Sequence, residues 1–219
     1  MNLKQGLDER VHDLFIEGFY AGEYQAGQKV DPAVLAQQFS ISRTPVIQAL
    51  KRLTTEGILT VSSGGKYFIP MPTKKLLYEV CDMRCLLEQH AVSIHIRNKD
   101  ENVRKQLEGI ANQCMEAMKG DRMVNSVKRD LEFHRRLVEL TGNRCLLEAY
   151  TPILNRYVSI KYSLGHQYDT QEIASKRHLE IMQYLMEGNE KEARHSVWMH
   201  IEYARQIMEG LMDESSEQP

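Results

Sequence analysis

The chain has 219 residues and is 42% hydrophobic, enough apolar material for buried cores, which argues against a disordered protein. Its 28 basic and 30 acidic residues nearly cancel, so the overall charge indicates neither a nucleic-acid nor a membrane partner, and any DNA-binding surface must be local. No apolar run is long enough to span a membrane and the start lacks a signal-peptide layout, so we expect a cytoplasmic protein with no membrane partner.

The N-terminal part predicts three short helices, of which the last two form a helix-turn-helix. Apolar residues at helical spacing predict the first helix, over residues 7–21. Asp31 and Pro32 suit the cap and the first position of a second helix. A short turn ends at Ser42, which is placed to cap a third helix that stops before Gly57. Two helices joined by about three residues match a helix-turn-helix.

A predicted hairpin follows these helices. Two strands, over residues 58–61 and 66–69, flank a Gly-rich turn, which is typical of the wing of a winged helix. Between residues 40 and 66 there are four basic residues and one acid, so the positive charge is local. Arg43 opens the third helix, where side chains reach base edges and backbone amides favour a phosphate. A charge run alone more often marks a solvated face, but its combination with turn and wing favours DNA binding.

Residues 27–69 resemble the winged helix-turn-helix of the GntR family of bacterial repressors, through the segments LA, SRTPV, AL, EG and the wing glycine. The resemblance implies that residues 42–45 begin the recognition helix and that Gly65 lets the backbone approach DNA. Ile47 and Gln48 replace the usual basic residue and Glu, and Ala26 replaces the usual proline before Gly27, which implies a different or weaker half-site. The DNA-contacting candidates are Ser42, Arg43, Thr44, Pro45, Gln48, Lys51, Arg52, Gly65 and Lys66.

Prolines at positions 70 and 72 stop regular structure and predict a boundary. We expect a winged domain over residues 1–70, a linker over 71–73, a helical domain over 74–213 and a tail over 214–219. Six helices are predicted in the helical domain, at about 74–97, 101–118, 123–141, 144–163, 170–187 and 190–211. Clear breaks lie at Gly120-Asp121, Gly142-Asn143 and Gly188-Asn189, and a fourth lies at 165–170. The expected fold is mainly α, a winged helix-turn-helix followed by an all-helical bundle.

Four residues of the helical part are candidates for a metal site. Asp130 and His134 share one helix face at spacing i,i+4, and His178 and His200 lie on separate later helices. A helical bundle can point such side chains inward to one centre. The spacing by itself is weak evidence, because surface Asp–His pairs of this kind are common. Histidines assigned no role are His12, His90, His95, His166 and His195.

Four cysteines fall within the predicted helices and form no CxxC pair, as expected of reduced thiols. Cys81 and Cys85 share a helix face at spacing i,i+4. We interpret them as packing residues, with a redox sensor as the alternative.

Residues 74–213 resemble the FCD effector domain of the FadR-type branch of the GntR family, a bundle of six or seven helices. The resemblance lies in R-x-x-x-E at Arg84, D-x-x-F-H at Asp130, two G-N turns, and the histidines at 178 and 200. In metal-binding members one Asp and three His hold a divalent cation, which maps onto Asp130, His134, His178 and His200. Zinc is the first candidate, with nickel, manganese or iron as the others. Members that bind acyl chains lack this set, so its presence argues against a fatty-acyl effector.

These features together predict a ligand-responsive transcription repressor that is not an enzyme. A small organic acid would bind at or beside the metal, with Arg84 and Arg156 neutralising its charge; an ion pair with Glu88 is the alternative role for Arg84. Winged modules of this kind usually read a near-palindromic operator in pairs, so we expect a homodimer.

Two other functions are alternatives to the repressor. The first is a metal-dependent hydrolase carrying a winged interaction module, since one Asp and three His can activate water. No general base stands at a motif spacing such as HExxH beside the ligands, which argues against it. The second uses the winged module for protein interaction or dimerisation, which Ile47 and Gln48 in the recognition helix would suit.

Overall fold

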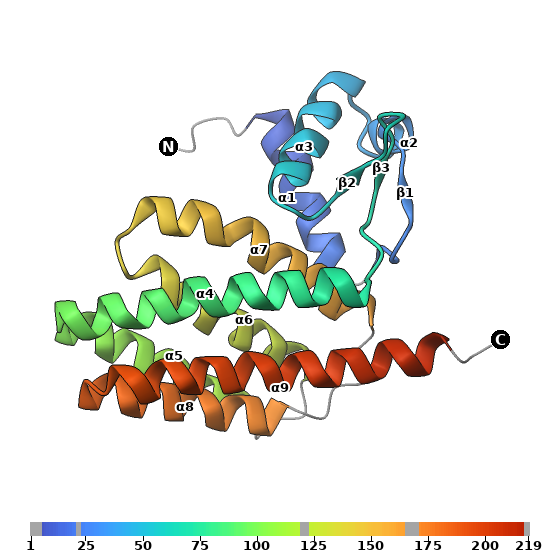
Figure 1. The fold of residues 1–219 in the computed structure, drawn as a ribbon. Helices are drawn as coiled ribbons and strands as arrows, with labels where there is room; N and C mark the ends of the chain where they lie inside the picture. The colour runs from blue at the N-terminus through green and yellow to red at the C-terminus, as the bar shows by residue number, and fades with distance from the viewer. Residues whose placement is uncertain (1–5, 21–22, 119–122, 165–170, 217–219) are drawn as a thin grey trace. The chain divides into compact units, whose positions relative to one another are not determined.

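The computed structural model describes residues 6–20, 23–118, 123–164 and 171–216 (Figure 1). The chain divides into two compact units between Pro72 and Thr73, with Val158–Ser163 grouped with the first unit. The predicted breaks at Gly120-Asp121 and 165–170 lie outside the described residues.

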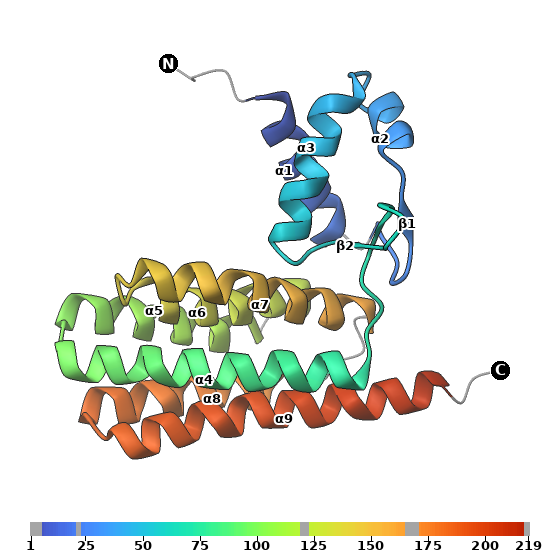
Figure 2. The ribbon, with the colours of Figure 1, turned by 45° about the horizontal axis from the view of Figure 1, so that its top comes forward.

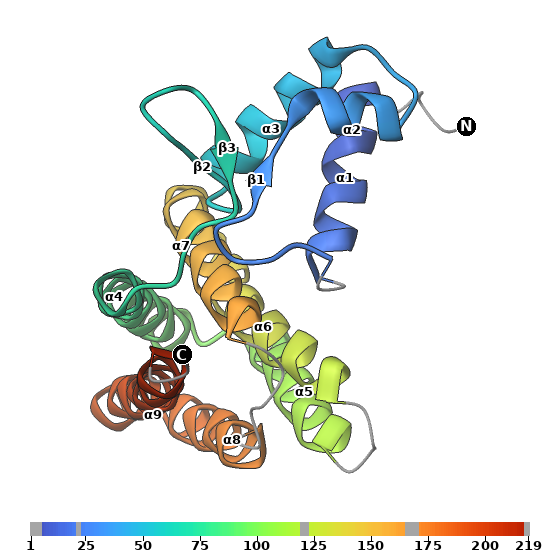
Figure 3. The ribbon, with the colours of Figure 1, turned by 90° about the vertical axis from the view of Figure 1, so that its right-hand side faces the viewer.

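The first unit is a winged helix-turn-helix. Helices α1 (Leu7–Tyr20), α2 (Pro32–Gln38) and α3 (Arg43–Thr55) confirm the three predicted helices. The unit also contains three short strands, β1 (Lys29–Val30), β2 (Thr60–Val61) and β3 (Tyr67–Phe68). They form a small antiparallel sheet in the order β1-β3-β2. Figure 3 shows the β2–β3 hairpin extending from this sheet as the wing. The core is apolar and includes Val11, Phe15, Phe19, Val46, Leu50 and Leu53.

The sheet differs from the predicted hairpin in two ways: strand β2 begins later than expected, and a third strand, β1, is present. Ile58 and Leu59 are buried and form no strand, because the chain is still closing the end of α3 there. Gly57 adopts a φ of 80°, and the Ile58 N–H donates to the Leu53 carbonyl at 2.9 Å, an arrangement that caps a helix C-terminus. Strand β1 was not predicted, since two residues are too few to show a period.

The two predicted N-caps of the motif behave differently. The Asp31 carboxylate accepts a hydrogen bond from the Ala33 N–H at 2.9 Å, as expected. Ser42 occupies the cap position of α3, but its side chain makes no capping hydrogen bond, so the predicted side-chain cap is wrong. Arg43 and Thr44 in the first turn of α3 are exposed, and the backbone N–H groups at a helix N-terminus favour a phosphate.

The turn between α2 and α3 contains a residue in a strained backbone conformation. Ser40 has a φ of 54°, a left-handed conformation that costs an L-residue roughly 1–2 kcal/mol and glycine little. Replacing Ser40 by Gly should remove this strain, although glycine also increases the conformational entropy of the unfolded chain. The net stabilisation of the first unit should therefore be at most about 1 kcal/mol. Urea unfolding monitored by circular dichroism measures the change. Ser42→Gly is the control, because Ser42 has a φ of −71° and should gain nothing. A less stable Ser40→Gly protein would contradict the strain.

The second unit contains the six predicted helices, except that the last six residues of the fourth, Val158–Ser163, are grouped with the first unit. They are α4 (Lys74–Asn98), α5 (Glu101–Met118), α6 (Met123–Glu139), α7 (Arg144–Ser163), α8 (Gln171–Glu187) and α9 (Glu190–Ser216). Helix α9 ends at Ser216, later than the 211 expected, because its polar last turns carry no helix breaker. Thr73 and Asn143 cap α4 and α7 through side-chain oxygens.

These helices pack around a centre that is unusually polar. Both α4 and α8 pack against α9, and α5 packs against α6 and α8 (Figure 2). Apolar residues fill much of the interior, among them Leu77, Leu107, Leu137, Ile181 and Val197. Ionisable side chains are nevertheless buried in the same unit, among them Arg84, Glu88, Asp130, His134, His178 and His200. Burying so many polar groups is costly unless each is paired or binds a ligand, which marks this centre as a candidate site.

Candidate metal centre and nucleic-acid interface

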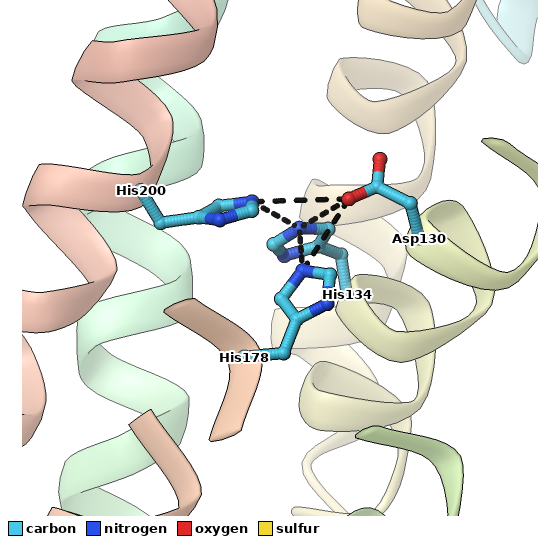
Figure 4. Close-up of side chains that lie close together, drawn as sticks. All are labelled: Asp130, His134, His178 and His200. Atoms are coloured by element: carbon cyan, nitrogen blue, oxygen red, sulfur yellow. Dashed lines mark hydrogen bonds and ion pairs between the residues drawn. The ribbon is translucent and has the colours of Figure 1, made fainter. Parts of the chain in front are cut away.

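Four buried side chains from three helices converge on one point of the second unit (Figure 4). Asp130 and His134 lie one turn apart on α6, His178 lies on α8 and His200 on α9. The Nε2 atom of His134 lies 2.8 Å from that of His200 and 3.2 Å from that of His178. Asp130 Oδ1 lies 3.3 Å from His178 Nε2, 3.7 Å from His134 Nε2 and 3.9 Å from His200 Nε2.

The geometry fits a single divalent cation. All four donor atoms lie within 4.8 Å of one another. Ligand atoms bound at about 2.1 Å to one ion are separated by about 3 to 3.5 Å, depending on its coordination, which is close to these distances. Neutral imidazoles cannot all satisfy one another through Nε2, because each pair needs one donor and one acceptor. A shared cation satisfies the three Nε2 lone pairs and the carboxylate together.

The surroundings also set the protonation of the histidines. Burial lowers the pKa of His178, and burial together with the neighbouring imidazoles of His178 and His134 holds the pKa of His200 well below its usual value. Both rings are therefore neutral at neutral pH, the form that binds a metal. For His134, burial acts downward, but the Glu88 and Asp130 carboxylates together outweigh it and raise the pKa.

Glu88 connects this centre to α4 and α7, a role that sequence analysis missed. Its carboxylate accepts hydrogen bonds from Arg84 Nε at 2.9 Å and from the Tyr150 hydroxyl at 2.8 Å, and lies 2.7 Å from His134 Nδ1. Burial would raise the pKa of Glu88, but Arg84 and His134 outweigh it and hold the pKa at about 2. The spacing of Arg84 and Glu88 indicated their ion pair, while no sequence signal pointed from Glu88 to His134.

Arg84 and Arg156 occupy different environments. Arg84 is 1% exposed, its guanidinium lies over the Tyr157 ring at 4.0 Å, and its terminal NH2 group is buried without a hydrogen-bond partner. Arg156, on α7, is exposed. The structure thus forms the Arg84–Glu88 ion pair and leaves one end of the same guanidinium able to accept a ligand. Nothing brings Arg156 to the buried centre in the described part of the chain.

The DNA-contacting candidates lie on one helix and the wing of the first unit. Their side chains are exposed, apart from half-buried Pro45. The buried residues Val46, Ala49, Leu50 and Leu53 hold the opposite face of α3 in the core, which leaves Arg43, Gln48, Lys51 and Arg52 outside. Gly65, at the hairpin turn, has a φ of 72° and no neighbour within 4 Å of an added Cβ.

Arg52 is a candidate whose side chain already has a hydrogen-bond partner. Its Nε donates to Glu56 Oε1 at 2.8 Å, and Glu56 Oε2 lies 2.6 Å from His12 Nε2 on α1. A phosphate must share or replace Glu56 to reach Arg52. Lys51 and Arg43 are exposed, and no side-chain hydrogen bond is shown for either among the described residues. We therefore expect them to contact DNA more readily than Arg52 does.

Comparison with known proteins places these two units in a family. A model described as bacterial regulatory proteins of the gntR family matches residues 7–69, and a model described as the FCD domain matches residues 79–203. The chain belongs to the GntR family. It therefore is a transcription regulator with a DNA-binding winged helix-turn-helix and a C-terminal helical FCD domain, as the resemblance implied.

Relatives of this GntR-family chain include regulators from several bacteria. The Nta operon transcriptional regulator of Aminobacter aminovorans is 30% identical over 190 residues, covering 85% of this chain and 87% of the relative. The gluconate operon transcriptional repressor of Bacillus subtilis is 24% identical over 154 residues, covering 68% and 63%. The solved structure of E. coli McbR/YncC has the same fold, with a TM-score of 0.78 at 20% identity, covering 94% of this chain and 98% of that one.

Several other histidines and cysteines in the described part of the GntR-family chain have ordinary surroundings. His95 Nε2 lies 2.7 Å from the Leu137 carbonyl, His195 stacks on Trp198, and His166 lies outside the described residues. Burial raises the pKa of Cys81 to about 11 and of Cys85 to about 12, so both stay protonated, which suits packing residues better than a redox sensor. No helix in the described ranges has the length and apolar character to cross a membrane.

Proposed function

We propose that this regulator is a repressor that senses a small organic acid at a divalent metal ion held by Asp130, His134, His178 and His200. The observation that carries the proposal is the convergence of these four buried donors inside the FCD domain. Zinc is the first candidate, and nickel, manganese or iron suit the same oxygen and imidazole donors. A bound ion would supply a positive charge and a coordination position for a carboxylate oxygen.

The acid has a second point of attachment in Arg84. A buried guanidinium NH2 without a partner favours an anion, since an unsatisfied buried donor costs about 1–3 kcal/mol. A carboxylate close to both the cation and Arg84 would meet two positive groups in a water-poor centre. Arg156 is exposed and is proposed only as an outer residue that attracts the acid.

The winged unit supplies the output of the sensor. We assign residues 1–70 to DNA binding, 71–73 to a linker and 74–213 to effector binding and dimerisation. Two copies related by a two-fold axis would place two α3 helices in successive major grooves of a near-palindromic operator. Arg43 reaches base edges, while Lys51 and Lys66 contact phosphates. Repacking of the helical domain on binding the acid would change the spacing of the two winged units.

Titration of the protein with its own upstream DNA tests this function. We expect affinity to fall steeply as salt rises, because phosphate contacts release counterions, and we expect two chains per operator by analytical ultracentrifugation. A scrambled duplex of equal length is the control, which should bind more weakly at every salt concentration. Binding that is absent or insensitive to salt, or one chain per operator, would contradict the proposal.

A further inference from the structure

Glu88 is a buried carboxylate that joins three helices at the edge of the metal centre. It is 0% exposed on α4, and its partners Tyr150 and His134 lie on α7 and α6. Oε1 takes both the Arg84 Nε–H and the Tyr150 hydroxyl, whereas Oε2 faces only His134 Nδ1 among the bonds shown, at 2.7 Å. One oxygen of Glu88 therefore contacts Arg84, the candidate anion-binding residue, and the other contacts His134, a candidate metal ligand.

The contact with Oε2 decides which nitrogen of His134 carries the proton. A carboxylate only accepts hydrogen bonds, so His134 must donate from Nδ1. In the neutral ring Nε2 is then bare, and its lone pair faces His178 and His200. By contrast, His178 Nδ1 and His200 Nδ1 are buried and have no hydrogen-bond partner. Of the three rings, His134 is the one whose Nδ1 faces a charged neighbour, Glu88.

We infer that Glu88 is a positioning residue for the cation: it holds His134 in the tautomer that binds a metal, and through its other oxygen it links that ring to Arg84. Outer carboxylates of this kind orient a histidine ligand and increase its basicity. An acid that pairs with the unpartnered end of Arg84 would share the positive charge of the guanidinium with Glu88, and so would strengthen the interaction of the Glu88 carboxylate with His134. Metal and acid are therefore coupled through a single side chain.

Glu88→Gln separates this role from simple packing, because glutamine has almost the same shape. Its amide cannot accept from Arg84, Tyr150 and His134 together, since one end is now a donor. If the amide NH2 faces His134, Nδ1 must accept, so the imidazole proton moves to Nε2 and prevents metal binding there. If the amide NH2 faces Arg84 and Tyr150 instead, it meets their N–H and O–H donors and forms no hydrogen bond with Arg84. This inference rests on the proposed metal centre, so wild-type binding of zinc must be measured beside the variant.

The experiment is zinc affinity of the full chain, measured by competition with a chromophoric chelator. We expect Glu88→Gln to bind zinc about 10- to 100-fold more weakly than wild type. Tyr150→Phe is the matched control: it removes a hydrogen bond to the same carboxylate but leaves Oε2 on His134, so its zinc affinity should stay close to wild type. If Glu88→Gln does not fold, Glu88→Asp serves instead, because a shorter side chain cannot span Arg84 and His134 and should also weaken zinc binding.

The tautomer gives a second readout that needs no metal. In ¹⁵N-histidine NMR spectra of the metal-free protein at alkaline pH, His134 should carry its proton on Nδ1 in wild type and lose this preference in Glu88→Gln. Equal zinc affinities of wild type and Glu88→Gln, or a wild-type His134 protonated on Nε2, would overturn the inference and leave the metal centre intact. A wild-type protein that does not bind zinc, nickel, manganese or iron would overturn the proposed centre itself.

Discussion

Replacing His178 by alanine is expected to abolish retention of a divalent ion and the stabilisation that the ion gives. His178 is fully buried and its Nε2 lies 3.3 Å from Asp130 Oδ1, so removing its ring leaves three of the four converging donors. Loss of an outer partner of a ligand already costs about 10- to 100-fold in metal affinity, and loss of a ligand should cost more. Metal content after purification and thermal unfolding with and without zinc measure the effect.

The size of the thermal effect follows from linkage. An ion present at about 1,000 times its dissociation constant stabilises the native state by about 4 kcal/mol, which for a chain of this length raises Tm by roughly 8 to 16 °C. Wild type should show this shift and His178→Ala should not. His195→Ala is the control, because that histidine is exposed and stacks on Trp198, and it should keep both metal and shift. Unchanged metal content in His178→Ala would refute the assignment.

Arg43→Ala should reduce discrimination between the operator and other DNA by about 5- to 150-fold. Arg43 is the first residue of α3 and is exposed, the position from which a side chain reaches a base edge. A bidentate contact from arginine to guanine is worth about 1–3 kcal/mol. The ratio of operator to scrambled-duplex affinity, at one fixed salt concentration, measures this loss.

Lys51→Ala provides the contrasting control for Arg43. Lys51 is exposed on the same helix, further from its N-terminus, and is assigned to a phosphate. Its loss should weaken binding to every duplex alike and reduce the salt dependence by about one charge, without changing the ratio. If both variants lowered the two affinities equally, Arg43 would not be a base-reading residue.

The six helices of the second unit and the three of the first could be predicted because each shows an apolar period and clear punctuation. Asp31, Gly57 and Gly188 stop or start helices through local backbone chemistry that a single sequence displays. Strand β1 could not be predicted, since its pairing with β3 is a tertiary contact between residues far apart in the chain. Ser42 shows the same limit, because a capping residue type does not guarantee that its hydroxyl makes the bond.

The candidate site divides in a similar way. The spacing of Asp130 and His134 put both on one helix face, but bringing in His178 and His200 required the family resemblance, because nothing in the sequence fixes how α8 and α9 face α6. Glu88 was visible only as a neighbour of Arg84 at i,i+4. Its contact with His134 joins residues 46 positions apart, and it depends on the packing of α4 against α6.

The depth of the four donors has a consequence for timing. Asp130, His134, His178 and His200 are each at most 5% exposed and lie on three different helices, so an ion can enter or leave only when those helices part. Such openings are slow compared with the free diffusion of a small ion in water. The cation would then behave as a long-lived component of the fold, and an acid that binds beside it would have to wait for the same opening.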